Sequence, residues 1–376
     1  MSKITKVLLV VSIVLFVAVA AATLVLFGSE LGIFPEETVP TTEATTEATT
    51  EPTTEATTEP TTEPPTEPPV VIRHPLTGEQ LEEPLTDRIF AVSISNIKDA
   101  LPHIGVNDCD MFFEMFITTG VVRGLALYTD IENVPQIGSV RSTRINFADI
   151  ALGYDAFLAH AGGSQMVLNY VAETGIDHKN IDTSTKTKYG FRDFARNSAG
   201  WGFVHCLFVD GPGLKTWAAE KEYRVSHEEE KTYNLNFVDA GALEAGDTAN
   251  TISIDMKFLG SKKNTTMIYD PEVGEYTYKQ YGKIMQDGTT KATETFKNVF
   301  ILSVEETYRD PYAVANLLGT GDGFYASDGK IIPIKWVREN ATDPFSFTMA
   351  DGSPLYQNVG RSYVNLAPIG SEILCE

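Results

Sequence analysis

Cysteine is scarce in this chain of 376 residues. Cys109, Cys206 and Cys375 form an odd set without a CxxC spacing, which argues against a disulfide framework and a cysteine-bound zinc ion and leaves room for one bridge at most. The chain also lacks an HExxH metal motif, a GxSxG nucleophile elbow and a GK[ST] phosphate loop. We therefore predict no metal site and no cofactor.

Positive charge is also in short supply, with 29 lysines and arginines against 51 acidic residues and a formal net charge of −22. Ten glutamates against Lys3 and Lys6 supply about −8 of this charge within the first 69 residues, which leaves about −14 on the remainder. Non-specific attraction to nucleic acid or to anionic lipid is disfavoured by this sign. We predict no nucleic-acid partner.

The N-terminus carries an uncharged apolar run, from Val7 to Phe27, after Lys3 and Lys6. At about 1.5 Å per residue, this run is long enough to cross a hydrocarbon core of about 30 Å. It continues past Ala22, where a cleaved signal peptide would turn polar, so an uncleaved anchor is favoured over cleavage. We expect residues 1–28 to span the cell membrane once, with the N-terminus in the cytoplasm and the later domains outside.

Residues 29–70 predict a disordered stalk, because Thr41 to Pro69 consist almost entirely of Thr, Glu, Pro and Ala in a TTEA/TTEP repeat. Such a segment has too few apolar side chains to offset the entropy of ordering its backbone. Its prolines favour an extended, semi-stiff chain, and its threonines would permit O-glycosylation. We interpret it as a spacer that holds the later residues away from a membrane.

The remaining residues predict an α+β protein with two domains. Strands alternate with helices across residues 86–230, which is typical of a mixed α/β layer domain. Short strands separated by turn signals fill residues 245–375, which predicts a mostly antiparallel β domain. The expected strands are 88–96, 110–118, 121–129, 154–160, 251–258, 266–269, 275–281, 298–304, 323–326, 330–337, 346–349 and 362–367, and the expected helices are 142–152, 165–173 and 214–223.

Several short motifs in both halves resemble the YerB-like lipoprotein family, a bacterial envelope family whose two halves are domains of unknown function. In the first half they are Phe113-Glu114, the Gly120-to-Arg123 turn, the GSVRSTR run from Gly138 to Arg144, the HAGGS run from His160 to Ser164, Phe191-Arg192-Asp193 and His205. In the second half they are Tyr269-Asp270, Asp287, Asn298-Val299, Gly321 to Gly323, Asp328-Gly329-Lys330, Trp336 and Gly360 to Pro368. The resemblance implies a surface-tethered, two-domain protein and supplies no reaction.

The chain departs from the family pattern at four points. Ser139 stands where the family usually has proline, Thr118 where it has a second acidic residue, and Cys206 where it has asparagine. The apolar span replaces the lipid-bearing cysteine. A function of the family that needs the second acid or the asparagine would be altered here.

The GSVRSTR run places Arg141 and Arg144 three residues apart at the start of an expected helix, where both can lie on one face. Two guanidinium groups beside a helix N-terminus can bind a carboxylate or a phosphate, and Arg123 and Arg192 could extend this site. The alternative is that each arginine pairs with a carboxylate of the chain, such as Asp149, and only stabilises the fold.

The HAGGS run is expected at the end of a strand, followed by a turn and a helix. This placement brings His160 and Ser164 to the carboxyl edge of a sheet, where α/β domains commonly bind ligands. Gly162 and Gly163 would allow a ligand to approach the backbone closely. The alternative is a tight turn in which Ser164 caps the helix.

Glu114 lies in an otherwise apolar strand, where an unpaired carboxylate would be costly. Arg123 or Arg141 could satisfy it as a structural ion pair. Glu114 could instead act as a general base near His160, with His205 and Arg192 completing a catalytic site.

These observations favour an extracytoplasmic envelope protein that binds a cell-wall component, either a peptidoglycan fragment or an anionic glycopolymer. The proposed ligand-binding residues are Arg123, Arg141, Arg144, His160, Gly162, Gly163, Ser164 and Arg192. The alternative is an envelope hydrolase or transferase with Glu114, His160 or His205 as acid or base. A third possibility is a scaffold that contacts other envelope proteins.

Overall fold

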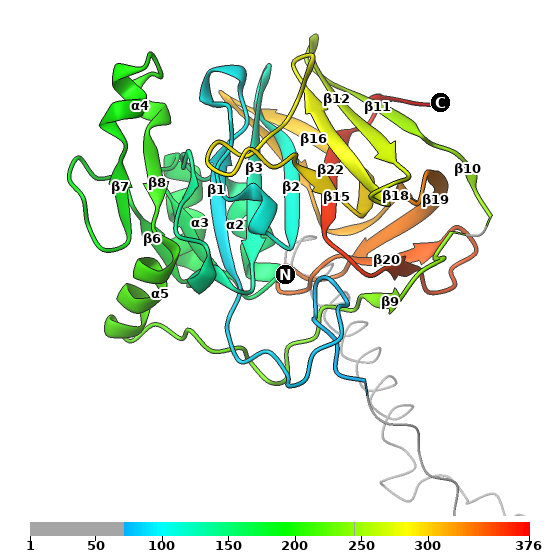
Figure 1. The fold of residues 1–376 in the computed structure, drawn as a ribbon, viewed down its shortest axis with the longest axis horizontal. Coiled ribbons are helices and arrows are strands. Elements are labelled where there is room, and N and C mark those ends of the chain that lie inside the picture. Colours follow the sequence, from blue (N-terminus) through cyan, green and yellow to red (C-terminus); the bar gives the residue numbers. More distant parts are fainter. Residues whose placement is uncertain (1–70, 244) are drawn as a thin grey trace, which may run out of the picture. The chain divides into compact units, whose positions relative to one another are not determined.

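A computed structural model describes residues 71–243 and 245–376 of the chain (Figure 1). The predicted anchor, and the predicted stalk up to residue 70, lie outside the described residues. Within the described part, no helix is both long enough and apolar enough to cross a membrane. The described residues form one compact unit.

A large twelve-stranded sheet runs through both halves of the chain. Its central strands are β1 (Phe90–Ser95), β3 (Val121–Tyr128) and β2 (Met111–Thr118), which pair antiparallel. On one side follow β5 (Phe157–His160) and β6 (His178–Asn180), both parallel to β1. On the other side follow β22 (Ser362–Pro368), β16 (Asn298–Arg309), β18 (Gly319–Ser327), β19 (Lys330–Arg338) and β10 (Asp247–Thr248), with β17 (Tyr312–Asn316) beside β16 and β20 (Ser346–Met349) beside β19.

The smaller sheets complete the strands of the fold. A six-stranded sheet contains β14 (Lys283–Ile284), β13 (Glu275–Gln280), β12 (Ser261–Asp270), β11 (Thr251–Phe258), β23 (Glu372–Cys375) and β15 (Thr295–Phe296). Its strand β11 alternates buried and half-buried residues, as expected for a strand with one face on the core. A three-stranded sheet contains β4 (Ile137–Gly138), β8 (Leu207–Val209) and β7 (Gly190–Arg192). A two-stranded sheet contains β9 (Asn236–Val238) and β21 (Tyr356–Asn358).

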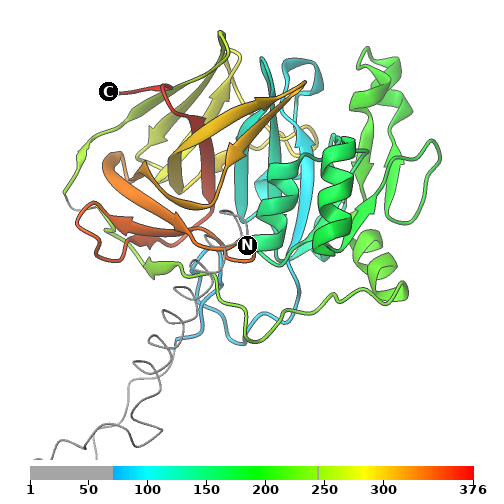
Figure 2. The same cartoon turned by 180° about the vertical axis from the view of Figure 1, so that it is seen from behind.

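The described residues form four short α-helices: α2 (Ile145–Gly153), α3 (Gln165–Thr174), α4 (Phe194–Ser198) and α5 (Gly211–Glu220). Figure 2 shows α2 and α3 side by side over one face of the large sheet. Phe147 and Val167 of these helices share an apolar cluster with Leu125 of β3, whereas Phe112 of β2 packs toward Phe296 on the other face. The sheet therefore separates two apolar cores.

The α+β class is confirmed, with an α/β N-terminal region and a mostly antiparallel C-terminal region. The two regions are joined in one sheet, because β2 pairs in parallel with β22 from Met111 opposite Ser362 to Glu114 opposite Asn365. The expected helices and the long strands are present within a few residues. The short strands β6, β7, β17 and β23 were not predicted. Strands β6, β7 and β23 have three or four residues each, too few for a clear alternation, and β23 pairs with the distant strand β11.

Glu306 of β16 has a largely buried carboxyl group. One oxygen of this group has no hydrogen-bond partner among the described residues. Burial raises the pKa of Glu306 from 4.5 to about 8. The folded protein therefore holds this proton more tightly than the unfolded chain does, and the resulting stability is lost as the pH rises toward 8.

The wild type should lose stability between pH 5 and pH 8 as Glu306 loses its proton. We expect Glu306→Gln to lose less stability over the same pH range. At pH 8 the variant should exceed the wild type in free energy of unfolding by about 3–4 kcal/mol, relative to their difference at pH 5. Denaturant titrations of both proteins at the two pH values measure this. An equal loss in both proteins would contradict the assignment.

Candidate functional site

The candidate site lies at the carboxyl ends of the parallel strands β1 and β5. There, backbone hydrogen bonds join the segment that begins at Arg141 to β1 and to the turn that follows β5. The Arg141 N–H donates to the Ser93 carbonyl at 2.9 Å, and the Ala161 N–H donates to the Arg141 carbonyl at 3.0 Å. The Thr143 N–H then donates to the Gly162 carbonyl at 3.0 Å. Residues 141–144 are thus held in an extended line across this edge of the sheet.

Arg123, Arg141 and Arg144 form what we call the arginine cluster, and none of them makes an ion pair with a carboxylate of the described chain. Each donates to a backbone carbonyl instead: Arg123 to Ser142, Arg141 to Val204 at 3.3 Å and Arg144 to Thr143 at 2.7 Å. The Arg144 guanidinium also lies over the Tyr312 ring, 4.8 Å from its centre. Asp149, an expected partner, pairs with Arg338.

The charges of the arginine cluster act on one another. Burial, followed by the charges of Arg144 and Arg141, lowers the pKa of Arg123. Burial also lowers the pKa of Arg141 and of Arg144, and the charge of Arg141 adds to the effect on Arg144. Because a guanidinium stays protonated at neutral pH, these shifts mean that the cluster carries an unfavourable free energy that a bound anion would relieve.

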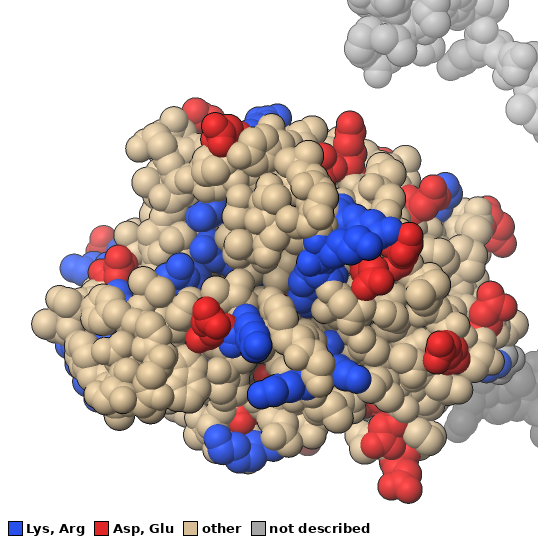
Figure 3. Space-filling view, turned by 90° about the horizontal axis from the view of Figure 1, so that it is seen from above, with Lys and Arg blue, Asp and Glu red and all other residues tan. Residues whose placement is uncertain are grey.

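One face of the protein carries many lysine and arginine side chains (Figure 3). Figure 3 shows a face on which lysine and arginine side chains gather in and beside hollows, although the chain as a whole is strongly acidic. Arg123 is 6% exposed, while Arg141 and Arg144 are half-buried. Arg141 and Arg144 are therefore more accessible to a ligand than Arg123.

Arg141 and Arg144 do not lie on one face of a helix. This differs from the prediction made from the sequence. Helix α2 begins at Ile145, after an extended Arg144 with a φ of −133°. The arginines come together because the chain before the helix is held against β1 and β5. The prediction that Arg141 and Arg144 lie on one face of a helix is wrong, and their role in binding a ligand stays a prediction.

The His160–Ser164 turn satisfies its own polar groups. His160 is fully buried, its Nδ1 lies 2.8 Å from the Gly162 carbonyl and its Nε2 lies 2.9 Å from Nδ1 of His178. Burial lowers the pKa of His160 to about 4. The Ser164 hydroxyl accepts from the Val167 N–H at 3.3 Å and caps α3. The structure thus favours the capped-turn interpretation, in which this turn supports residues 141–144.

Gly162 and Gly163 fit the turn for steric reasons. Gly162 has a φ of +78°, a conformation that favours glycine, and its N–H donates to Oδ1 of Asn180 at 3.0 Å. A Cβ atom on Gly163 would lie 2.8 Å from a methyl group of Val167. Both glycines therefore serve the packing of the turn, with α3 directly behind it.

Arg192 differs from the arginine cluster, because it is paired with a carboxylate. Its Nη2 lies 2.6 Å from Oδ1 of Asp182, and its other nitrogens donate to the carbonyls of Thr183 and Phe203 at 2.8 and 2.9 Å. Its guanidinium also lies 4.0 Å from the centre of the Phe203 ring. The structure therefore indicates a structural role for Arg192.

Glu114 is fully buried on the opposite face of the sheet from Arg123. It pairs with Lys263 of β12, so the expected partner, Arg123 or Arg141, is wrong. Further donors complete the shell around its carboxylate: Asn96 at 2.6 Å, Thr265 at 2.7 Å, Asn365 at 3.1 Å, Tyr278 at 3.3 Å and Tyr363. Burial raises the pKa of Glu114, but Lys263 and these hydrogen bonds outweigh it and the pKa is lowered.

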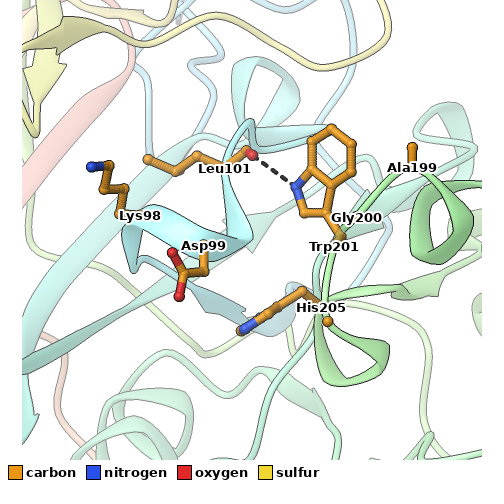
Figure 4. A pocket seen from close by; sticks show the side chains of 8 residues that line it. Lys98, Asp99, Leu101, Ala199, Gly200, Trp201 and His205 are labelled. Atoms are coloured by element: carbon orange, nitrogen blue, oxygen red, sulfur yellow. Dashed lines mark hydrogen bonds between the residues drawn. The ribbon is translucent and has the colours of Figure 1, made fainter.

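His205 adjoins the arginine cluster and lines a hollow of about 470 Å³. Burial, followed by the charge of Arg141, lowers the pKa of His205. Figure 4 shows the hollow, with Asp99 and His205 on facing sides and the Trp201 indole donating to the Leu101 carbonyl at 2.9 Å. Asp99 and Trp201 carried no sequence signal, because they match no motif and come from segments about a hundred residues apart.

The described residues contain no group of three or more His, Cys, Asp or Glu side chains that could hold a metal ion. Cys109, Cys206 and Cys375 are free. The first two are buried, and burial raises the pKa of the Cys109 thiol to about 12.

Two family models match the two regions of the chain. Residues 76–224 match the N-terminal domain, and residues 254–364 the C-terminal domain, of a protein of unknown function, DUF3048. The chain belongs to the DUF3048 family. Within this family, "Putative lipoprotein YerB" of Bacillus subtilis is 24% identical over 304 residues, covering 79% of this chain and 86% of that protein.

The DUF3048 fold also matches a solved structure. The crystal structure of YerB from Bacillus subtilis superposes with a TM-score of 0.68 at 22% identity, covering 81% of this chain and 99% of that chain. The likeness shows a shared fold across nearly all of YerB. It is in agreement with the YerB-like resemblance of the sequence motifs.

Proposed function

We propose that this protein is a membrane-anchored envelope protein that binds an acidic cell-wall component through Arg123, Arg141 and Arg144. The observation that carries the proposal is the absence of a carboxylate partner for these three arginines among the described residues. A buried or half-buried guanidinium without a counter-ion is costly, and a carboxylate or phosphate of a ligand would supply the missing charge.

The place of action follows from the N-terminal residues and from the named relative. The apolar run before the stalk supports a single membrane span, with the DUF3048 region outside the cytoplasm. YerB is named as a putative lipoprotein, and a lipid-anchored relative supports an envelope location for this chain. In that location, the acidic ligands that we propose are peptidoglycan fragments and anionic glycopolymers.

Within the proposed site, the arginine cluster binds the ligand and the His160–Ser164 turn holds the cluster in place. The turn has its hydrogen bonds filled by the chain itself, so it contributes shape and rigidity. Arg192 and its ion pair with Asp182 support the neighbouring segment in the same way.

An acid–base enzyme is the weaker candidate. Glu114 and His160 do not converge, since the carboxylate of Glu114 lies in the core that faces the six-stranded sheet. Both ring nitrogens of His160 lie within hydrogen-bond distance of chain atoms, which removes the free lone pair that a general base needs.

The proposal is tested by titrating the full chain with acidic and neutral wall fragments in calorimetry. We expect binding of muropeptides or polyol-phosphate oligomers and no binding of neutral chitobiose. The affinity should fall about tenfold or more between about 0.05 and 0.5 M salt, because salt screens exposed charges. Equal binding of acidic and neutral fragments, or no binding of any acidic fragment, would refute the proposal.

A further inference from the structure

The hollow beside the arginine cluster is built from two segments that are distant in the sequence. Lys98, Asp99 and Leu101 come from the turn after β1, and Trp201, Gly202 and His205 come from the segment before β8. Its volume of about 470 Å³ lies in the range of about 300–1,000 Å³ that is typical of small-molecule sites.

His205 lines this hollow and has one polar atom without a partner in the described chain. The side chain is 8% exposed, yet its Nδ1 atom has no hydrogen-bond partner in the described chain. A buried nitrogen of this kind costs free energy unless a ligand or water satisfies it. The Arg141 guanidinium donates to the carbonyl of Val204, the residue before His205, at 3.3 Å, so the hollow and the arginine cluster are neighbours.

The other walls offer one aromatic surface and groups of both charges. The Trp201 indole is fixed by its hydrogen bond to Leu101 and by the Arg196 guanidinium, which lies 4.9 Å from the ring centre. Lys98 and Asp99 are exposed at the rim and supply a donor and an acceptor. A rigid aromatic ring beside mixed polar groups suits a hydroxylated ring with an apolar face of C–H groups, such as a sugar.

We propose that this hollow is a saccharide subsite, which takes the sugar ring next to the acidic group bound by the arginine cluster. This inference rests on the proposed function and makes it more specific, because the ligand is then an acidic saccharide rather than a bare anion. The acidic group could be the carboxylate of a muramyl sugar or the phosphate of a glycosylated polyol phosphate.

Gly202→Leu is the variant that tests the subsite. Gly202 is exposed and has a φ of −59°, which any residue adopts, and a Cβ there would meet only the His205 ring at 3.5 Å. The leucine should fill the hollow without strain. Ala195→Leu is the matched control, because Ala195 is exposed in the adjacent helix α4 and does not line the hollow.

The full chain and both variants are titrated with an N-acetylglucosaminyl-N-acetylmuramic acid disaccharide, a glucosylated glycerol-phosphate oligomer, its unglucosylated form and inorganic phosphate. We expect Gly202→Leu to weaken binding of one or both of the sugar-bearing probes by about tenfold or more, while the affinities of the sugar-free probes stay within about twofold. A response of only one sugar-bearing probe identifies the source, and a response of both means that the subsite accepts either sugar. Ala195→Leu should bind every probe as the wild type does.

The outcomes separate the two proposals. If no acidic probe binds the wild type, the proposed function fails. If acidic probes bind and Gly202→Leu leaves the sugar-bearing probes unchanged, the saccharide subsite is refuted while anion binding stands. If circular dichroism shows that Gly202→Leu is unfolded, the exposed variant Asp99→Asn decides, with an expected loss of about threefold or more for the sugar-bearing probes alone and no change as the refuting result.

Discussion

Lys263→Met is expected to lower the free energy of unfolding by about 3–5 kcal/mol. Glu114 and Lys263 are both buried, with side chains that are 0% and 4% exposed. Removing the ammonium group leaves a carboxylate in the core that faces the six-stranded sheet, without its opposite charge. The same change forces the pKa of Glu114 upward, because burial then dominates. Denaturant titration with a spectroscopic probe measures the loss.

Lys262→Met is the matched control for this experiment. Lys262 precedes Lys263 in β12 and is exposed, so its replacement should change stability by less than about 0.5 kcal/mol. Equal effects of the two substitutions would mean that the Glu114–Lys263 pair does not hold the large sheet and the six-stranded sheet together.

Arg141→Gln combined with Arg144→Gln should weaken binding of an acidic wall fragment by about a hundredfold or more, since each arginine supplies charge-assisted hydrogen bonds. The same double variant should be at least as stable as the wild type. In the wild type, the guanidinium groups of Arg141 and Arg144 lie near Arg123 and make no ion pair with a carboxylate of the described chain. Their removal therefore relieves electrostatic repulsion. Calorimetric titration and thermal unfolding of the same samples measure both effects.

Arg192→Gln separates a binding arginine from a structural one. Because Arg192 pairs with Asp182 and two carbonyls, we expect the substitution to lower stability by about 1–3 kcal/mol and to leave binding within about threefold. A loss of stability in the Arg141/Arg144 double variant as large as that in Arg192→Gln, with binding unchanged, would show that the arginine cluster is structural.

The sequence predicts the long elements of this fold well, because each carries a local signal. The apolar strands at β1, β2 and β3 and the helix α3, which begins after Ser164 and ends at Gly175, all follow from pattern and capping. The parallel pairing of β2 with β22 does not, because it joins residues about 250 positions apart. No periodicity within either strand specifies that partner.

In the candidate site too, short motifs predict which residues belong together, whereas contacts between distant segments were not predicted. Arg141, Arg144 and the His160–Ser164 turn were predictable as neighbours, because short motifs place them on adjoining loops of one sheet edge. The partner of Glu114 was not, because Lys263 lies 149 residues away in a strand whose own pattern gives no sign of it. Trp201 and Asp99 were missed for the same reason.

The most direct test of the arginine cluster is a crystal structure of residues 68–376, whose described part forms one compact unit, with a bound muropeptide or glucosylated glycerol-phosphate fragment. The account predicts that the acidic group lies within hydrogen-bond distance of at least two of Arg123, Arg141 and Arg144, with a sugar ring against Trp201. A fragment bound at saturating concentration elsewhere on the surface, with these three arginines untouched, would contradict it.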